Sequence, residues 1–127
     1  MDQMMEREIV HTFFLKEKRA RAEYALCSKK RRTYIWGLDE TFFCVSDGID
    51  ITLKTPDEVR ELLIKCGGLC YVISVDEEID GAYLSITDAL QVVGNGPAIV
   101  AFPETHRVYF EGEYEIGAKT KRFILGI

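Results

Sequence analysis

Two passages of similar design lie between residues 55 and 104. The first is TPDEVRELLIKCGG at 55–68, followed by the apolar run LCYVISV at 69–75. The second is SITDALQVVGNG at 85–96, followed by AIVAF at 98–102. In each passage a capping residue precedes a short helical pattern, glycine ends the helix, and an apolar run typical of a buried strand follows. We therefore expect a helix–strand unit to occur twice in this part of the chain.

Both helical patterns begin with a capping signal. Thr55 precedes Pro56 at the first helical position and Glu58 at the third. This spacing predicts a capping box, with proline at a position where its missing N–H costs nothing. Ser85 and Asp88 repeat the spacing, so we expect a second capping box at the start of the second helix.

The segments around these helices favour strands. The run at 69–75 is apolar at nearly every position, so we expect a strand covered on both faces and near the centre of the sheet. Residues 33–38, 42–46 and 49–54 are rich in β-forming residues, and Asp47-Gly48 is a strong hairpin signal. These segments predict a three-stranded antiparallel meander.

Further strands are expected in the second half of the chain, at 82–84, 98–102, 106–114 and 121–127. In the segment 106–114 we expect His106, Val108 and Phe110 on one face and Arg107, Tyr109 and Glu111 on the other. The predicted fold class is α+β: a mixed, largely antiparallel sheet with two or three helices packed on it. We expect one domain over residues 1–127, with a basic helical segment at 1–32 and a sheet-containing core at 33–127.

The N-terminal segment favours helix over residues 3–30. Asp2 is placed to cap its start, and a break is expected near residues 13–15. Residues 17–28 have the stronger helical pattern. We expect the cations at 29–32 to lie at the C-terminal end of this helix, where they would suit the negative end of the helix dipole.

Composition limits the class of protein. The chain has 127 residues, 47% of them hydrophobic, which is enough for a core without disulfides or metal. No apolar run approaches the roughly 20 residues needed to span a bilayer, and residues 1–8 are charged, so we expect no membrane segment and no secretory leader. We interpret Cys27, Cys44, Cys66 and Cys70 as free thiols in a reducing cytoplasm. No metal or cofactor is predicted, since a zinc site at Cys66 and Cys70 would need Cys27 and Cys44, which are isolated in sequence.

No catalytic motif is present. The passage Gly94-Asn95-Gly96 follows a helix, whereas a phosphate-binding loop precedes one. The acidic turn at 76–81 lacks the spaced ligands of a calcium loop, so a solvated turn is the favoured interpretation over a divalent-cation site. His11 and His106 are remote in sequence, and His106 and Tyr109 are expected on opposite faces of one strand. A small enzyme centred on His106 is therefore a weaker hypothesis than a non-enzymatic protein.

Charge is unevenly distributed along the chain. Residues 1–32 carry nine basic and five acidic groups, a net charge of +4, and residues 33–127 carry seven basic and sixteen acidic groups, a net charge of −9. Basic residues that could contact phosphates gather in the first of these segments, and aromatic residues that could stack on bases follow them. The predicted nucleic-acid-binding residues are Lys16, Lys18, Arg19, Arg21, Lys29, Lys30, Arg31, Arg32, Tyr34 and Trp36, and Tyr24 is a further stacking candidate. Two alternatives remain open: a solvated helix face, or a surface that docks an acidic protein partner or a dimer mate.

Two segments resemble a known family. Residues 53–68 and 84–93 resemble the N-terminal domain of archaeal tRNA-splicing endonuclease subunits, in which a strand leads into a capped Pro/Asp-Glu helix and a Leu-Ser helix comes next. The similarity covers under half of the chain, and Cys66 stands where the family tends to glycine. The family's nuclease domain has no counterpart after Gly96, so no catalytic residue is carried over. The resemblance implies a non-catalytic unit that binds or assembles on structured RNA. We therefore expect an RNA-binding module or accessory subunit.

Overall fold

The computed structural model describes residues 1–44, 48–94, 96–113 and 116–126. Its strands form one six-stranded sheet in the order β1-β6-β5-β4-β2-β3, and every pairing in it is antiparallel. The strands are β1 (Gly48–Asp50), β2 (Leu69–Ser74), β3 (Tyr83–Ser85), β4 (Ala98–Phe102), β5 (Arg107–Glu111) and β6 (Arg122–Leu125). The α+β class is confirmed, and the described sheet is antiparallel where a mixed sheet was expected.

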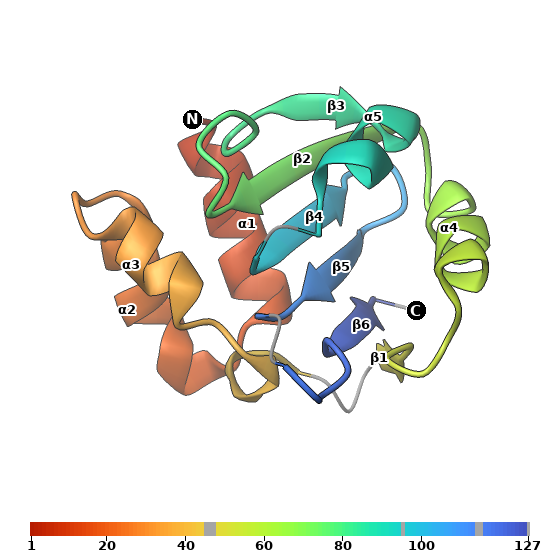
Figure 1. Ribbon diagram of the computed structural model, residues 1–127. Coiled ribbons are helices and arrows are strands. Elements are labelled where there is room, and N and C mark those ends of the chain that lie inside the picture. The colour runs from red at the N-terminus through yellow and green to blue at the C-terminus, as the bar shows by residue number, and fades with distance from the viewer. Residues whose placement is uncertain (45–47, 95, 114–115, 127) are drawn as a thin grey trace.

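Helices cover both faces of the sheet. The α-helices are α1 (Gln3–Phe13), α2 (Arg19–Leu26), α3 (Arg31–Trp36), α4 (Pro56–Ile64) and α5 (Ile86–Val92), and the 3₁₀ helices are η1 (Lys16–Lys18) and η2 (Glu40–Phe42). Figure 1 shows α1, α2 and α3 on one side of the sheet and α4 and α5 on the other. The sheet is therefore the middle layer of three.

Alternation along the strands divides the core in two. Ile73 and Phe110 pack with Ile9, Ala22 and other residues of the α1–α3 layer. Val72, Val100 and Tyr109 pack with the α4–α5 layer, together with Val59 and Ala89. Because successive strand residues point to opposite faces, strands with both faces covered are apolar at almost every position. This explains the continuous apolar runs of β2 and β4.

The two capped helices are confirmed. Thr55 Oγ1 accepts a hydrogen bond from Glu58 N at 3.2 Å, and the Glu58 side chain accepts one from Thr55 N at 3.1 Å, which completes the capping box of α4. At α5, Ser85 Oγ accepts from Asp88 N at 3.2 Å, but the Asp88 side chain does not bond back to Ser85 N, so this helix has a cap without the expected capping box. Each cap satisfies backbone N–H groups that the first helical turn leaves without partners.

The N-terminal helix is interrupted at the expected place. Asp2 caps α1 by accepting from Met5 N at 3.0 Å. After α1 the chain extends, and Phe14 forms an isolated β-bridge with Phe43, their rings 4.7 Å apart between centroids. This bridge separates α1 from η1 and α2, so the segment 3–30 is three short elements that pack together.

The strand predicted at 33–38 is wrong, because this segment forms helix α3. Tyr34 N donates to the Lys30 carbonyl at 2.9 Å, and Ile35 is fully buried in the layer formed with α1 and α2. Strand preference in aromatic and β-branched residues reflects packing more than backbone preference, so tertiary contacts override it here. The cations at 29–32 are also placed differently, since Arg31 and Arg32 begin α3 and do not end the preceding helix.

The rest of the predicted meander is largely wrong. Phe42 ends η2 and Phe43 contributes an isolated bridge, while residues 45–47, including Asp47 of the expected hairpin, lie outside the described residues. The strand expected at 49–54 ends at Asp50, because Asp50 Oδ1 accepts from Thr52 N at 2.9 Å and turns the chain. What remains is β1, a short edge strand paired with β6.

Two other expectations change. Strand β2 is covered on both faces, but it lies between β4 and the edge strand β3, not at the centre of the sheet. His106 precedes β5 in a turn with a positive φ of 54°, so it does not share the face of Val108 and Phe110. Across the described ranges, no helix is both long and apolar enough to cross a membrane.

Candidate nucleic-acid interface

A groove lies between α2 and α3, where the chain reverses direction. Ser28 fixes the reversal, because its Oγ donates to the Ala25 carbonyl at 2.9 Å and accepts from Lys30 N at 3.1 Å. Ala22 and Leu26 face the core, so the opposite side of α2 is turned to solvent. The groove has a volume of about 540 Å³. Its lining includes Lys18, Arg21, Tyr24, Lys30, Tyr34 and Phe42.

Three cations line the groove without acidic partners. Among the described residues, neither Lys18, Arg21 nor Lys30 forms an ion pair, whereas Arg7, Arg31, Arg32, Lys54 and Arg122 all do. Glu17 is the acidic residue of the lining. The groove therefore carries a positive charge that attracts an anion.

Aromatic rings form part of the groove wall. The Lys18 ammonium lies 4.9 Å from the centroid of the Phe42 ring, a cation–π contact. Tyr34 and Phe42 meet edge to face, with their centroids 6.0 Å apart. Tyr24 is 74% exposed, an unusual exposure for a ring of this size. Cations interleaved with rings are the combination used to bind nucleic-acid backbones and bases together.

The Tyr34 hydroxyl is buried and has no hydrogen-bond partner among the described residues. Burial raises the pKa of this hydroxyl, and the positive charge of Arg21 opposes the rise. Arg21 and Tyr34 both line the groove. A buried polar group without a partner is rare in folded proteins and requires an explanation.

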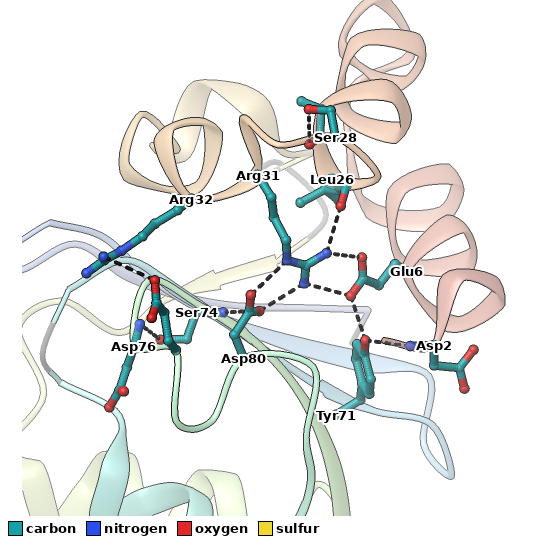
Figure 2. A network of polar contacts seen from close by, with 12 residues as sticks. Asp2, Glu6, Leu26, Ser28, Arg31, Arg32, Tyr71, Ser74, Asp76 and Asp80 are labelled. Carbon is teal, nitrogen blue, oxygen red and sulfur yellow. Dashed lines mark hydrogen bonds and ion pairs between the residues drawn. The ribbon is translucent and has the colours of Figure 1, made fainter.

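Arg31, although predicted as a surface cation, is buried in a different arrangement. Its side chain is 11% exposed, and its guanidinium lies between Glu6 and Asp80 (Figure 2). Glu6 accepts hydrogen bonds from Nη1 at 2.5 Å and from Nη2 at 2.7 Å. Asp80 accepts from Nε at 2.8 Å and from Nη2 at 2.9 Å. The Leu26 carbonyl accepts from Nη1 at 3.0 Å. These bonds use all the donors that a guanidinium has, so Arg31 has none left for a phosphate.

Tyr71 also belongs to this network. We call Glu6, Arg31, Tyr71 and Asp80 together the Arg31 clamp, and the backbone of Asp2 bonds to it. Tyr71 Oη donates to Glu6 Oε2 at 2.5 Å and accepts from Asp2 N at 3.1 Å. Burial, together with the hydrogen bond to Glu6, raises the pKa of Tyr71 above its ordinary range. Burial alone would lower the pKa of Arg31, but its bonds to Asp80 and Glu6 raise it. The clamp ties α1, α3, β2 and the turn before β3 together and holds the wall of the groove in place.

Asp80 belongs to the acidic turn that the sequence suggested was solvated. It is only 10% exposed and also accepts from Ser74 N at 3.1 Å, so its role is structural. The prediction for this residue was therefore wrong, because its partner lies on a helix that the sequence did not indicate.

The remaining predicted residues lie elsewhere on the surface. Arg19 is half-buried and its Nε donates to the Phe14 carbonyl at 3.1 Å, while Lys16 and Lys29 are exposed. Arg32 extends away from Arg31 and pairs with Glu77 at 3.3 Å (Figure 2). Trp36 lines a separate hollow beside Arg32 and the acidic turn. The structure thus brings Lys18, Arg21, Lys30 and Tyr34 together and separates the others from them.

The sequence did not identify Phe42 as part of the site. This residue was assigned to a strand of the meander, and it reaches the groove only because η2 folds back beside α2. Its contact with Lys18 joins residues 24 positions apart in the chain, which no local pattern indicates.

The other candidate centres are small or dispersed. His106 is exposed and lines a hollow of about 30 Å³ with Glu8 and Arg107. His11 pairs with Glu23 at 2.9 Å. Cys66 and Cys70 are buried, Cys27 is exposed, and all four cysteines are free thiols. Over the part of the chain that the structure describes, no group of three or more metal-ligating side chains gathers.

Comparison with protein-family models, with curated proteins and with solved structures finds no match for this chain. The resemblance of residues 53–68 and 84–93 to the splicing-endonuclease domain therefore stays a prediction. The groove between α2 and α3 is the feature of this structure whose geometry and charge bear on function.

Proposed function

We propose that this protein is a non-enzymatic RNA-binding module or accessory subunit that contacts RNA with the groove between α2 and α3. The observation that carries the proposal is the group of three cations, Lys18, Arg21 and Lys30, which line one groove and form no ion pair with the acidic residues that the structure describes. Cations held this way contribute to binding by releasing counterions from the phosphates they contact. Tyr24, Tyr34 and Phe42 supply the rings that RNA-binding surfaces use to stack on bases.

The proposed surface is narrower than the segment predicted from the sequence. Arg31 is engaged in the clamp and Arg32 is paired with Glu77. We therefore assign both residues to stabilising the structure around the surface and not to binding RNA. Lys16 and Lys29 are exposed at its margins and would add weaker, non-specific attraction.

Fluorescence anisotropy with a labelled RNA hairpin that carries a single-stranded 3′ extension tests the proposal. Three phosphate contacts on a single strand correspond to a slope of about −2 in log affinity against log salt, or roughly a twentyfold loss between about 50 and 200 mM salt. The triple variant Lys18→Glu, Arg21→Glu and Lys30→Glu should lose at least tenfold in affinity at physiological salt, and most of the salt dependence.

A matched control carries the same change of charge at another place. Arg60, Lys65 and Lys119 are exposed and lie outside the groove, so their triple replacement by Glu should change affinity less than threefold. Equal losses in the two triple variants would reduce the groove to a generic cationic face and contradict the proposal.

An acidic protein partner is the second candidate, because the same unpaired cations suit carboxylates as well as phosphates. The two candidates differ in their use of the rings. RNA binding should weaken when Tyr24 is replaced by Ala, whereas attraction to a polyglutamate peptide should not. Competition of the labelled RNA by polyglutamate at equal charge concentration separates the two outcomes.

A further inference from the structure

We infer that the groove between α2 and α3 holds one unpaired nucleotide, with its base against the aromatic wall near Tyr34 and its phosphates on the surrounding cations. This inference rests on the proposed RNA-binding function and specifies the form of RNA that the groove selects. It assigns the Tyr34 hydroxyl as the group that hydrogen-bonds the base.

The size of the groove suits a single nucleotide and not a duplex. A volume of about 540 Å³ falls within the range of sites that enclose small molecules. A double helix would lie across the rim, where its phosphates could reach Arg21 and Lys30 but its bases would stay paired and stacked. An unpaired base can turn into the groove, as in most sequence-specific RNA recognition.

The lining offers both kinds of contact that an unpaired nucleotide needs. Tyr24 presents a largely exposed ring at the rim, and Tyr34 and Phe42 present ring edges and faces further in. Stacking on such rings tolerates any base, because every base has a π face. Lys18, Arg21 and Lys30 lie around the rings, in reach of the phosphates on either side of the base.

The Tyr34 hydroxyl explains why a base, and not only a phosphate chain, would enter. It is buried without a partner among the described residues, so the folded protein bears the desolvation cost of this group with no compensating hydrogen bond there. A hydroxyl both donates and accepts, and the edge of every base offers a matching group. A tyrosine hydroxyl keeps its proton at neutral pH, so it can donate to the base.

Arg21 lines the same groove as Tyr34, and it is exposed and forms no ion pair among the described residues. A phosphate next to the bound base can therefore contact Arg21 without breaking an ion pair inside the protein.

Three labelled RNA duplexes that differ only at their centre test the inference. The first is fully paired, the second has one additional, bulged nucleotide, and the third has an abasic residue in place of that nucleotide. We expect the protein to bind the bulged duplex about tenfold more tightly than the paired duplex, and the abasic duplex no more tightly than the paired one. Tyr34→Phe keeps the ring and should lose about fivefold on the bulged duplex alone. Tyr83→Phe, which removes a tyrosine hydroxyl on strand β3 outside the groove, is the matched control and should leave all affinities unchanged.

The possible outcomes distinguish the site for one unpaired nucleotide from the proposed RNA-binding function on which it rests. Salt-sensitive binding of equal strength to all three duplexes would overturn the nucleotide site and leave RNA binding by the cations intact. Equal binding of the bulged and abasic duplexes, or no effect of Tyr34→Phe, would overturn the assigned role of the base or of the hydroxyl. Failure to bind any duplex or the hairpin at physiological salt would overturn both the inference and the proposed function.

Discussion

The Arg31 clamp and the groove between α2 and α3 share helix α3 and are built from similar residue types, yet they use charge and hydroxyl groups in opposite ways. In the clamp, Arg31 meets two carboxylates and the Tyr71 hydroxyl has a partner on each side. In the groove, Arg21 lacks an acidic partner and the Tyr34 hydroxyl lacks any partner among the described residues. Satisfied buried networks stabilise a fold, whereas groups left without partners are available to a ligand.

The largest expected effect comes from breaking the clamp. Arg31→Met should lower the free energy of unfolding by about 3–5 kcal/mol, because Glu6 and Asp80 would stay buried with no opposite charge between them. Urea denaturation followed by circular dichroism measures this loss. The neighbouring change Arg32→Met removes only an exposed ion pair and should cost at most about 1 kcal/mol.

Similar costs for the two arginine variants would contradict the distinction between clamp and surface. The double variant Arg31→Met with Glu6→Gln sharpens the test. It removes one of the two uncompensated carboxylate charges, so it should recover part of the stability that Arg31→Met loses.

A smaller effect compares the two tyrosine hydroxyls. Tyr71→Phe removes a hydrogen bond to a buried carboxylate and should cost about 2 kcal/mol. Tyr34→Phe removes a buried hydroxyl that has no partner, so stability should stay the same or rise slightly. Thermal unfolding of both variants beside the wild type measures the difference. A destabilised Tyr34→Phe protein would mean that this hydroxyl is satisfied inside the fold and is not held for a ligand.

The comparison also shows what the sequence could predict. The caps of α4 and α5 were predictable because Thr55 with Glu58 and Ser85 with Asp88 lie three residues apart, and local geometry alone decides such contacts. The apolar runs of β2 and β4 were predictable because burial on both faces leaves a continuous pattern.

The segment 31–36 could not be predicted in this way. Its helix is held by Arg31, whose partners lie 25 positions away at Glu6 and 49 positions away at Asp80. The sequence predicts its cations and aromatic residues as part of a binding surface. It could not divide them, because whether an arginine is buried or exposed depends on carboxylates that only the tertiary fold brings near.

The smallest predicted effect tests the clamp through pH. Because its folded-state pKa is raised, Tyr71 stabilises the protein fully below pH 10, where the unfolded chain also keeps the proton. Above that pH the unfolded chain loses the proton while the folded protein retains it, so stability falls as pH rises. At pH 11 the loss from one such tyrosine is about 1.4 kcal/mol. The cost of Tyr71→Phe should therefore shrink by about this amount between pH 8 and pH 11 in urea denaturation, since every other titrating side chain is common to both proteins. A cost that stays constant over this range would mean that folding leaves the pKa of Tyr71 unchanged, and the hydroxyl would then not be buried against Glu6.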